Sequence, residues 1–279
     1  MNRREPPSML SRCLVLILFL MSVAAPARAE PPNPIWPGGA RAAIVLSYDD
    51  ALRSQLDVAI PQLDAAGLRG TFFLNGTFAP EALPRWRSAA AHGHELGNHS
   101  FFHPCPAAAF PADPLYHAEN YRVATMLRDI AAMNNLLVAI DGRSGRSYGV
   151  PCSQTVVGGE DYVEALRASG LVRFVRTGGS GDGVILDPLS LDPMRVPSRS
   201  FTEINDAADL IGFVDAVLRA DGLGILMFHG VGGDYLQVSA EAHQALVRYL
   251  AEHRQEIWVA PFGEVMAQLT ASGSDGHGE

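Results

Sequence analysis

Residues 42–50 read AAIVLSYDD, a run of small and apolar residues that ends in two acidic ones. Residues 42–47 show no regular alternation of polar and apolar positions, which is typical of a β-strand buried on both faces. In parallel α/β folds the chemistry lies at the carboxyl ends of the strands. We therefore expect Asp49 and Asp50 to lie at a functional edge of a sheet.

The same unit, a short apolar strand followed by an amphipathic helix, recurs through most of the chain. Further strands are predicted at residues 71–74, 94–97, approaching 148, 172–176, 224–228 and 257–259. Helices are predicted at residues 52–66, 79–91, 113–134, 160–169, 206–220, 241–253 and 262–269. Repeated strand–helix units predict a parallel sheet that is either closed into a barrel or open and doubly wound.

Two histidines follow the third predicted strand. Residues 93–106 read GHELGNHSFFHPCP, which places His99 and His103 four residues apart. The residue before a proline prefers extended backbone, so Pro104 limits this segment to a single helical turn or a loop. Two imidazoles at this spacing can face one point and form half of a zinc-like site. The third ligand is expected from the acidic pair at residues 49–50.

Two histidines and one carboxylate leave positions open for water and substrate, as in a catalytic metal site. Adjacent side chains in extended backbone point to opposite sides, so Asp49 and Asp50 cannot both bind in the same way. One can bind the metal, while the other acts on the bound water as a general base. His229 directly follows the predicted strand 224–228 and could protonate a leaving group.

Three motifs occur in a characteristic order: SYDD at 47–50, HSFFH at 99–103 and LMFHG at 226–230. This order resembles the polysaccharide deacetylases of carbohydrate esterase family 4, the NodB-homology domain. The resemblance covers about residues 42–269 and implies a distorted (β/α) barrel. It also implies hydrolysis of an N- or O-acetyl group on a sugar.

The same resemblance assigns a role to each motif residue. It implies that Asp49 is the catalytic base and His229 the catalytic acid. The metal ligands that it implies are Asp50, His99 and His103. One divalent metal is expected, zinc above all, with cobalt or another divalent ion as alternatives.

The middle motif of that family reads R-x-P-Y-G, with an arginine that orients the base. Residues 146–153 read RSYGVPCS and allow two alignments. One matches Tyr148 and keeps Arg146 but loses the proline. The other matches Pro151 and puts Gly149 where the arginine belongs; we favour this one because it brings Cys152 to the site.

With Pro151 aligned, the backbone N–H of Cys152 is the expected oxyanion donor, a role that depends little on the side chain. Cys105 and Cys152 are expected to form a disulfide in an oxidising compartment, with two buried free thiols as the alternative. The residue that orients the base stays open, with Arg176 and Asp192 as candidates.

The N-terminus predicts export. Arginines precede the apolar run 14–25, and residues 27–29 read ARA, so residues 1–29 are expected to be a cleaved signal peptide of a secreted or periplasmic protein. An uncleaved anchor is the alternative, although the run is shorter than a spanning helix needs. The predicted organisation continues with an N-terminal arm at 30–41, the deacetylase domain at 42–270 and a disordered tail at 271–279.

The charge and composition of the chain limit the classes of partner that it can bind. Without residues 1–29 the chain keeps 17 of its 21 basic and 29 of its 30 acidic residues, a net charge of −12. We therefore expect no nucleic acid and no membrane as partners after signal cleavage, and a neutral or cationic substrate. The chain has no lysine, which excludes Schiff-base chemistry and a lysine-containing phosphate loop.

Three functions are compatible with these residues. The first is a secreted, metal-dependent deacetylase acting on an acetylated carbohydrate such as a glucosamine polymer, peptidoglycan or acetylxylan. The second is a catalytically weak, metal-containing carbohydrate-binding protein, suggested by the irregular arginine motif. The third is a non-haem iron oxygenase, which uses the same ligand set. The sequence predicts no oligomeric state.

Overall fold

The structure is a computed structural model that describes residues 1–2, 35–109, 113–179 and 182–275. Apart from its first two residues, the predicted signal peptide at 1–29 lies outside the described part of the chain.

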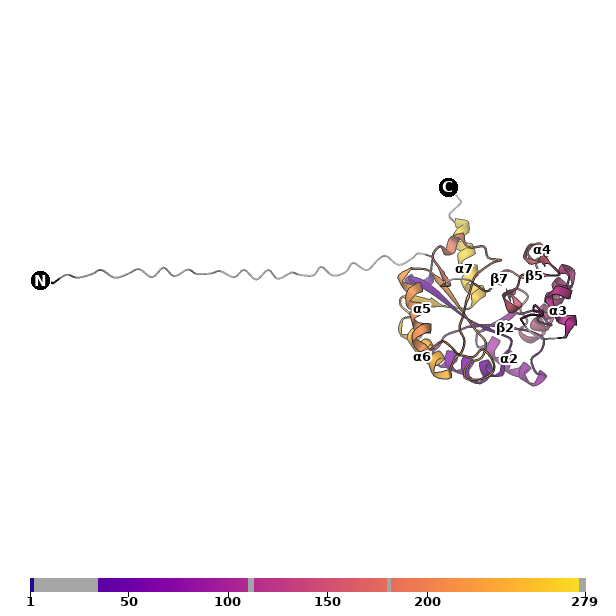
Figure 1. The fold of residues 1–279 in the computed structure, drawn as a ribbon, viewed down its shortest axis with the longest axis horizontal. Coiled ribbons are helices and arrows are strands. Elements are labelled where there is room, and N and C mark those ends of the chain that lie inside the picture. The colour runs from indigo at the N-terminus through magenta and orange to yellow at the C-terminus, as the bar shows by residue number, and fades with distance from the viewer. Residues whose placement is uncertain (3–34, 110–112, 180–181, 276–279) are drawn as a thin grey trace. The chain divides into compact units, whose positions relative to one another are not determined.

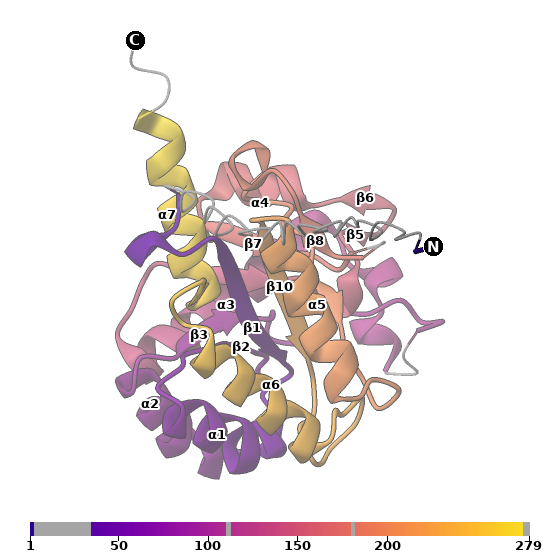
Figure 2. The ribbon, with the colours of Figure 1, turned by 90° about the vertical axis from the view of Figure 1, so that its left-hand side faces the viewer.

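A curled sheet of mostly parallel strands forms the centre of the fold (Figures 1 and 2). The strands are β1 (Ala42–Asp49), β2 (Thr71–Leu74), β3 (Glu95–Asn98), β4 (Ser147–Gly149), β7 (Phe174–Arg176), β8 (Val184–Ile185), β9 (Arg199–Ser200), β10 (Leu223–Phe228) and β11 (Ile257–Val259). Their order is β7-β4-β3-β2-β1-β10-β8, with β11 paired to β1 and β9 to β10. Only β8 pairs antiparallel among the described strands of this sheet. A separate hairpin joins β5 (Val156–Val157) and β6 (Glu160–Asp161).

The arrangement of strands and helices distinguishes between the two predicted architectures. From β1 to β7 the strands follow chain order, and β10 and β11 both return to pair with β1. Helices α2, α3 and α5 pack on the outside of this curl, with α5 against β1 and β10, and α2 and α3 against β3, whereas α7 packs on the opposite face of β1 (Figure 2). The fold is thus a half-barrel of the distorted (β/α) type, as predicted from the family resemblance.

The helices mostly match their predicted ranges. They are α1 (Ile60–Ala65, preceded by a π-helical turn at Gln55–Ala59), α2 (Leu83–Ala91), α3 (Val123–Asp141), α4 (Val163–Ser169), α5 (Ala207–Arg219), α6 (Ala240–Glu252) and α7 (Phe262–Asp275).

Strand β1 is apolar from Ala42 to Leu46 because it separates two cores. All eight of its residues are buried. Tyr48 lies in the core beneath the outer helices, where its ring stacks on Phe72 at 4.7 Å and Phe228 at 5.4 Å. Val45 lies on the opposite face, in a core that includes Phe262 of α7. Two-sided burial explains the uninterrupted run in the sequence.

The helix predicted at 113–134 is wrong in its position. Short 3₁₀ turns occupy Pro114–Tyr116 and Ala118–Asn120, and α3 begins only at Val123. The apolar residues that bury α3 lie further along the chain: Met126, Ile130, Met133, Leu137 and Ile140. This packing, which the local sequence does not reveal, determines the helix. Helix α3 is long and apolar enough to span a membrane, but core helices of globular domains also meet that criterion.

Both ends of the domain are more ordered than predicted. Trp36, in the segment expected to be an extended arm, is buried and its ring lies 6.0 Å from that of Trp258. Helix α7 continues to Asp275, into the stretch expected to be a disordered tail. Strands β5, β6, β8 and β9 have two residues each, too short for a periodic pattern to predict them.

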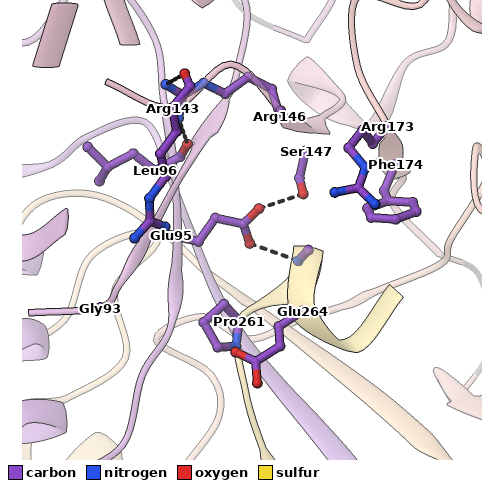
Figure 3. A pocket seen from close by; sticks show the side chains of 12 residues that line it. Gly93, Glu95, Leu96, Arg143, Arg146, Ser147, Arg173, Phe174, Pro261 and Glu264 are labelled. Atoms are coloured by element: carbon purple, nitrogen blue, oxygen red, sulfur yellow. Dashed lines mark hydrogen bonds between the residues drawn. The ribbon is translucent and has the colours of Figure 1, made fainter. Parts of the chain in front are cut away.

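A carboxylate joins three elements at the amino ends of the strands. Glu95 accepts hydrogen bonds from Thr71 Oγ1 at 2.8 Å. It also accepts them from Ser147 Oγ at 2.6 Å and from the backbone N–H of Gly263 at 2.9 Å (Figure 3). The last of these places a negative charge at the N-terminus of α7, where the helix dipole favours it. A cavity of about 270 Å³ lies beside it, at the end of the barrel opposite the predicted catalytic residues.

We predict that Glu95→Ala destabilises the protein by about 2–4 kcal/mol, because three donors lose a charged acceptor. Urea unfolding followed by circular dichroism measures this change. Glu264→Ala, which removes another carboxylate from the same cavity, is the matched control. Equal stability of the two variants would contradict the role of Glu95.

Candidate metal and active site

The residues predicted to be catalytic converge at the carboxyl ends of the strands. They line one cavity of about 740 Å³, to which the loops after β1, β3 and β10 contribute. The five predicted residues in its wall are Asp49, Asp50, His99, His103 and His229. The remaining wall includes Asn75, Thr77, Phe102, Tyr116, Val150, Cys152, Ser153, Met227, Tyr235 and Leu236.

Three of these residues have the geometry of a metal-ligand set. Ligand atoms of Asp50, His99 and His103 all lie within 4.8 Å of one another. His103 Nε2 lies 3.1 Å from Asp50 Oδ1, and His99 Nε2 lies 3.5 Å from the same oxygen. Tetrahedral ligands at about 2.0–2.1 Å from zinc would be about 3.3 Å apart, so the donor types and spacings fit that ion.

A backbone carbonyl group orients one of the three ligands. His99 Nδ1 donates to the carbonyl oxygen of Gly149 at 2.7 Å, which leaves Nε2 free to bind a metal. Burial lowers the pKa of His99 to about 4, although the carboxylate of Asp49 opposes this shift. His99 is therefore neutral near pH 7, as a metal ligand must be.

The other two ligands, Asp50 and His103, shift each other's pKa. Burial alone would raise the pKa of Asp50, but the hydrogen bond from His103 and the nearby histidines outweigh it and hold that pKa well below its usual range. For His103, burial favours the neutral form, yet the hydrogen bond and charge of Asp50 raise its pKa above the usual value. A proton on His103 consequently competes with a metal ion.

The two histidines are carried by a loop, one of the two conformations predicted. Ser100 and His103 have positive φ angles of 60° and 53°, which rules out a helical turn through them. The buried carboxylate of Asp129 accepts hydrogen bonds from the backbone N–H groups of Phe101 and Phe102, at 2.7 and 3.2 Å from Oδ1. The sequence analysis missed Asp129 because it lies in α3, 26 residues beyond His103.

The two adjacent aspartates have different partners. Arg176 Nη2 donates to both carboxylate oxygens of Asp49, at 2.8 and 2.7 Å. Asp50 instead accepts a hydrogen bond at Oδ2 from the hydroxyl of Tyr235, at 2.6 Å. Of the two candidates for the base-orienting residue, Arg176 therefore contacts Asp49, whereas Asp192 pairs with the exposed Arg167.

His229 faces the ligand set from the opposite rim. Its Nε2 lies 3.7 Å from Asp50 Oδ2, and its ring centroid lies 5.9 Å from that of Tyr235. Its Nδ1 is buried and has no hydrogen-bond partner among the described residues. Gln55 Nε2 donates to the carbonyl oxygens of Asp49 and His229, and so ties the two rims together; the sequence analysis missed it.

The segment 146–153 contributes less than the first alignment implied. Arg146 is buried, pairs with Asp141 and lines the cavity at the amino ends of the strands. The hydroxyl of Tyr148 lies 3.1 Å from that of Tyr162 in a separate core. Neither residue reaches the catalytic cavity, which corrects that expectation. Side chains alternate along β4, so Gly149 faces the site whereas Tyr148 does not.

The alignment on Pro151 agrees better with the structure. Pro151 is buried and is not among the residues that line the cavity, whereas Cys152 lines it. Cys152 forms the predicted disulfide with Cys105, with their Cα atoms 5.7 Å apart. The disulfide links the loop that carries His103 to the segment that follows β4.

Comparison with known proteins identifies the relationship. Residues 38–171 match the family description "polysaccharide deacetylase". Over those residues, which include Asp49, Asp50, His99 and His103, the chain is therefore similar to the polysaccharide deacetylases. No curated protein matches it significantly in sequence.

Solved structures share the fold of this chain at low sequence identity. A protein from Mycobacterium smegmatis described as a polysaccharide deacetylase is 17% identical, with a TM-score of 0.62 over 88% of this chain and 95% of that one. A family 4 acetyl xylan esterase from Clostridium thermocellum, solved with a cobalt ion, is 16% identical, with a TM-score of 0.51 over 81% and 90%. A family 4 pseudoenzyme from Bacillus anthracis is 15% identical, with a TM-score of 0.51 over 80% and 65%.

We predict that replacing both Cys105 and Cys152 by serine destabilises the protein by about 2–4 kcal/mol, because the disulfide constrains the unfolded chain. Guanidinium-chloride unfolding measures the change, and unmodified protein kept reduced should unfold like the double variant. Mass mapping of the unfolded, unreduced protein that found both cysteines as free thiols would contradict the disulfide.

Proposed function

We propose that this protein is a secreted, metal-dependent hydrolase that removes N- or O-acetyl groups from a carbohydrate. The observation that carries the proposal is the placement of Asp49 and His229 on opposite sides of the Asp50, His99 and His103 set, within one cavity. Export is inferred from residues 1–29 of the sequence alone.

Asp50, His99 and His103 would hold the metal, with zinc favoured by their donor types. When bound, such an ion supplies Lewis acidity and lowers the pKa of a water ligand. Asp49 accepts a proton from the attacking water while the oxygen of that water forms a bond to the acetyl carbon. The backbone N–H of Cys152, in the cavity wall, would stabilise the developing oxyanion.

His229 completes the reaction. As the bond from the acetyl carbon to the sugar nitrogen or oxygen breaks, His229 donates a proton to the leaving atom. The products are acetate and a free amino or hydroxyl group on the sugar. Water supplies the oxygen, so no oxidant or reductant is needed.

The cavity wall favours an uncharged substrate. None of its described residues is arginine or lysine, so a carboxylate or phosphate on the substrate, away from the metal and the histidines, would find no arginine or lysine partner there. The ring of Phe102 is 46% exposed and stacks on Tyr116 at 5.0 Å. An exposed aromatic face suits the apolar face of a sugar ring, which favours a neutral acetylated sugar.

The alternative is a catalytically weak, metal-containing carbohydrate-binding protein. The same fold occurs in a family 4 pseudoenzyme, and the chain lacks the regular arginine motif. The contact between Arg176 and Asp49 weighs against this alternative. The match of residues 38–171 to the polysaccharide deacetylases weighs against the iron oxygenase that the ligand set alone allows.

We predict that the zinc-loaded protein releases acetate from acetylated chito- or xylo-oligosaccharides. Asp49→Asn should lower kcat by about 10²–10⁴-fold, because the attacking water loses its general base. Enzymatic acetate assay and elemental analysis together should find this loss with the metal still bound. Release of no acetate from any acetylated sugar by the unmodified protein would instead support the binding alternative.

We predict that one divalent ion binds per chain and that binding weakens in acid. Since the pKa of His103 is raised in the metal-free site, protonation competes with the metal below that pKa and ceases above it. The affinity should therefore rise between about pH 5.5 and 8, by up to about tenfold per pH unit for one released proton. Isothermal titration calorimetry measures it. His103→Ala should abolish binding, whereas binding retained by that variant, or lost in the exposed control His92→Ala, would contradict the ligand assignment.

A further inference from the structure

Gly149 and Arg176 are direct neighbours across two strands. They pair in register between β4 and β7, at the carboxyl ends of both. Arg176 is completely buried, and its guanidinium carbon lies 4.9 Å from the centre of the Phe73 ring. Its Nη2 contacts both oxygens of Asp49, while its Nη1 contacts Met227.

The guanidinium occupies the space where a side chain at position 149 would begin. A Cβ atom at Gly149 would lie 2.6 Å from Arg176 Nη2 and 2.8 Å from Phe73 Cγ. These separations are shorter than van der Waals contact, and the buried guanidinium has little room to move. Any side chain at 149 thus requires Arg176 to leave its place at Asp49.

Arg176 also separates the functions of the two aspartates. Asp49 and Asp50 are both buried near His99, whose Nε2 lies 3.7 Å from Asp49 Oδ2 and 3.5 Å from Asp50 Oδ1. Without another partner, Asp49 would be free to join the imidazoles. The guanidinium holds both of its oxygens and keeps it apart from the ligand set.

We propose that Arg176 is the residue that positions Asp49 as the base, and that Gly149 is required because the two positions share one volume. In the alignment on Pro151, position 149 is where the family motif has its arginine. In this chain the guanidinium therefore comes from β7, the strand that pairs with β4, and not from β4 itself. This inference rests on the proposed deacetylase function and explains how an irregular motif can keep a competent base.

The first test is chemical rescue of Arg176→Ala. The variant should keep one metal per chain and a nearly unchanged KM, while kcat falls by about 100-fold because only the base is misplaced. Millimolar guanidinium should raise kcat of this variant by about tenfold or more, since it can refill the vacated space at Asp49. Sodium chloride at equal ionic strength is the control for screening.

A structural ion pair would behave differently. Arg146→Ala removes the other buried arginine–aspartate pair described here, at the opposite end of the barrel, and should lose stability without guanidinium-dependent recovery of kcat. Failure of guanidinium to raise kcat of metal-loaded Arg176→Ala would overturn the positioning role. A wild-type kcat in Arg176→Ala would also overturn the positioning role, but it would leave the proposed deacetylase function intact. If the unmodified protein were inactive, that result would count against the proposed function itself.

The second test is the exchange of the two residues. Gly149→Ala alone should lower kcat, because even a methyl group displaces the guanidinium, whereas Gly212→Ala, with no atom within 4 Å of its Cβ, should not. The double variant Gly149→Arg/Arg176→Gly should be about tenfold or more faster than Arg176→Gly alone, since it restores a guanidinium from the facing strand. If the double variant were no faster than Arg176→Gly, that result would overturn the proposal that positions 149 and 176 share one volume.

Discussion

Two adjacent carboxylates at the end of a doubly buried strand impose the main constraint on this site. Asp49 and Asp50 are only 3% and 7% exposed, and a buried charge without a partner is strongly unfavourable. The positive φ of 76° at Asp50 turns it away from its neighbour, so each carboxylate finds a separate partner. Arg176 binds the first, and His103 binds the second. The different roles proposed for the two carboxylates follow from this separation.

The barrel maintains a backbone that would be unfavourable in isolation. Left-handed residues such as Asp50, Ser100 and His103 cost about 1–3 kcal/mol each and persist only where surrounding contacts determine them. Here those contacts include the carboxylate of Asp129 beneath the histidine loop. The disulfide from Cys105 adds a covalent link to the same loop. The ligand set is thus preorganised by elements from distant parts of the chain.

Charge and apolar surface are segregated within the cavity. The ionisable groups gather over the ends of β1, β3 and β10, whereas Phe102, Tyr116, Met227 and Leu236 form much of the remaining wall. Such a division suits a substrate with one reactive polar group on a ring that has apolar faces.

The sequence alone determined the parallel α/β architecture and five residues of the site. Buried strands have a recognisable apolar pattern, and Asp49, Asp50, His99, His103 and His229 lie close to the carboxyl ends of such strands. Tertiary structure alone decided the partners of those residues. Arg176 and Asp129 act on residues far away in the chain, and the choice of Gly149 depends on a guanidinium from the neighbouring strand. Local patterns record burial and strand ends, whereas the pairing of buried charges depends on strand register and side-chain volume in three dimensions.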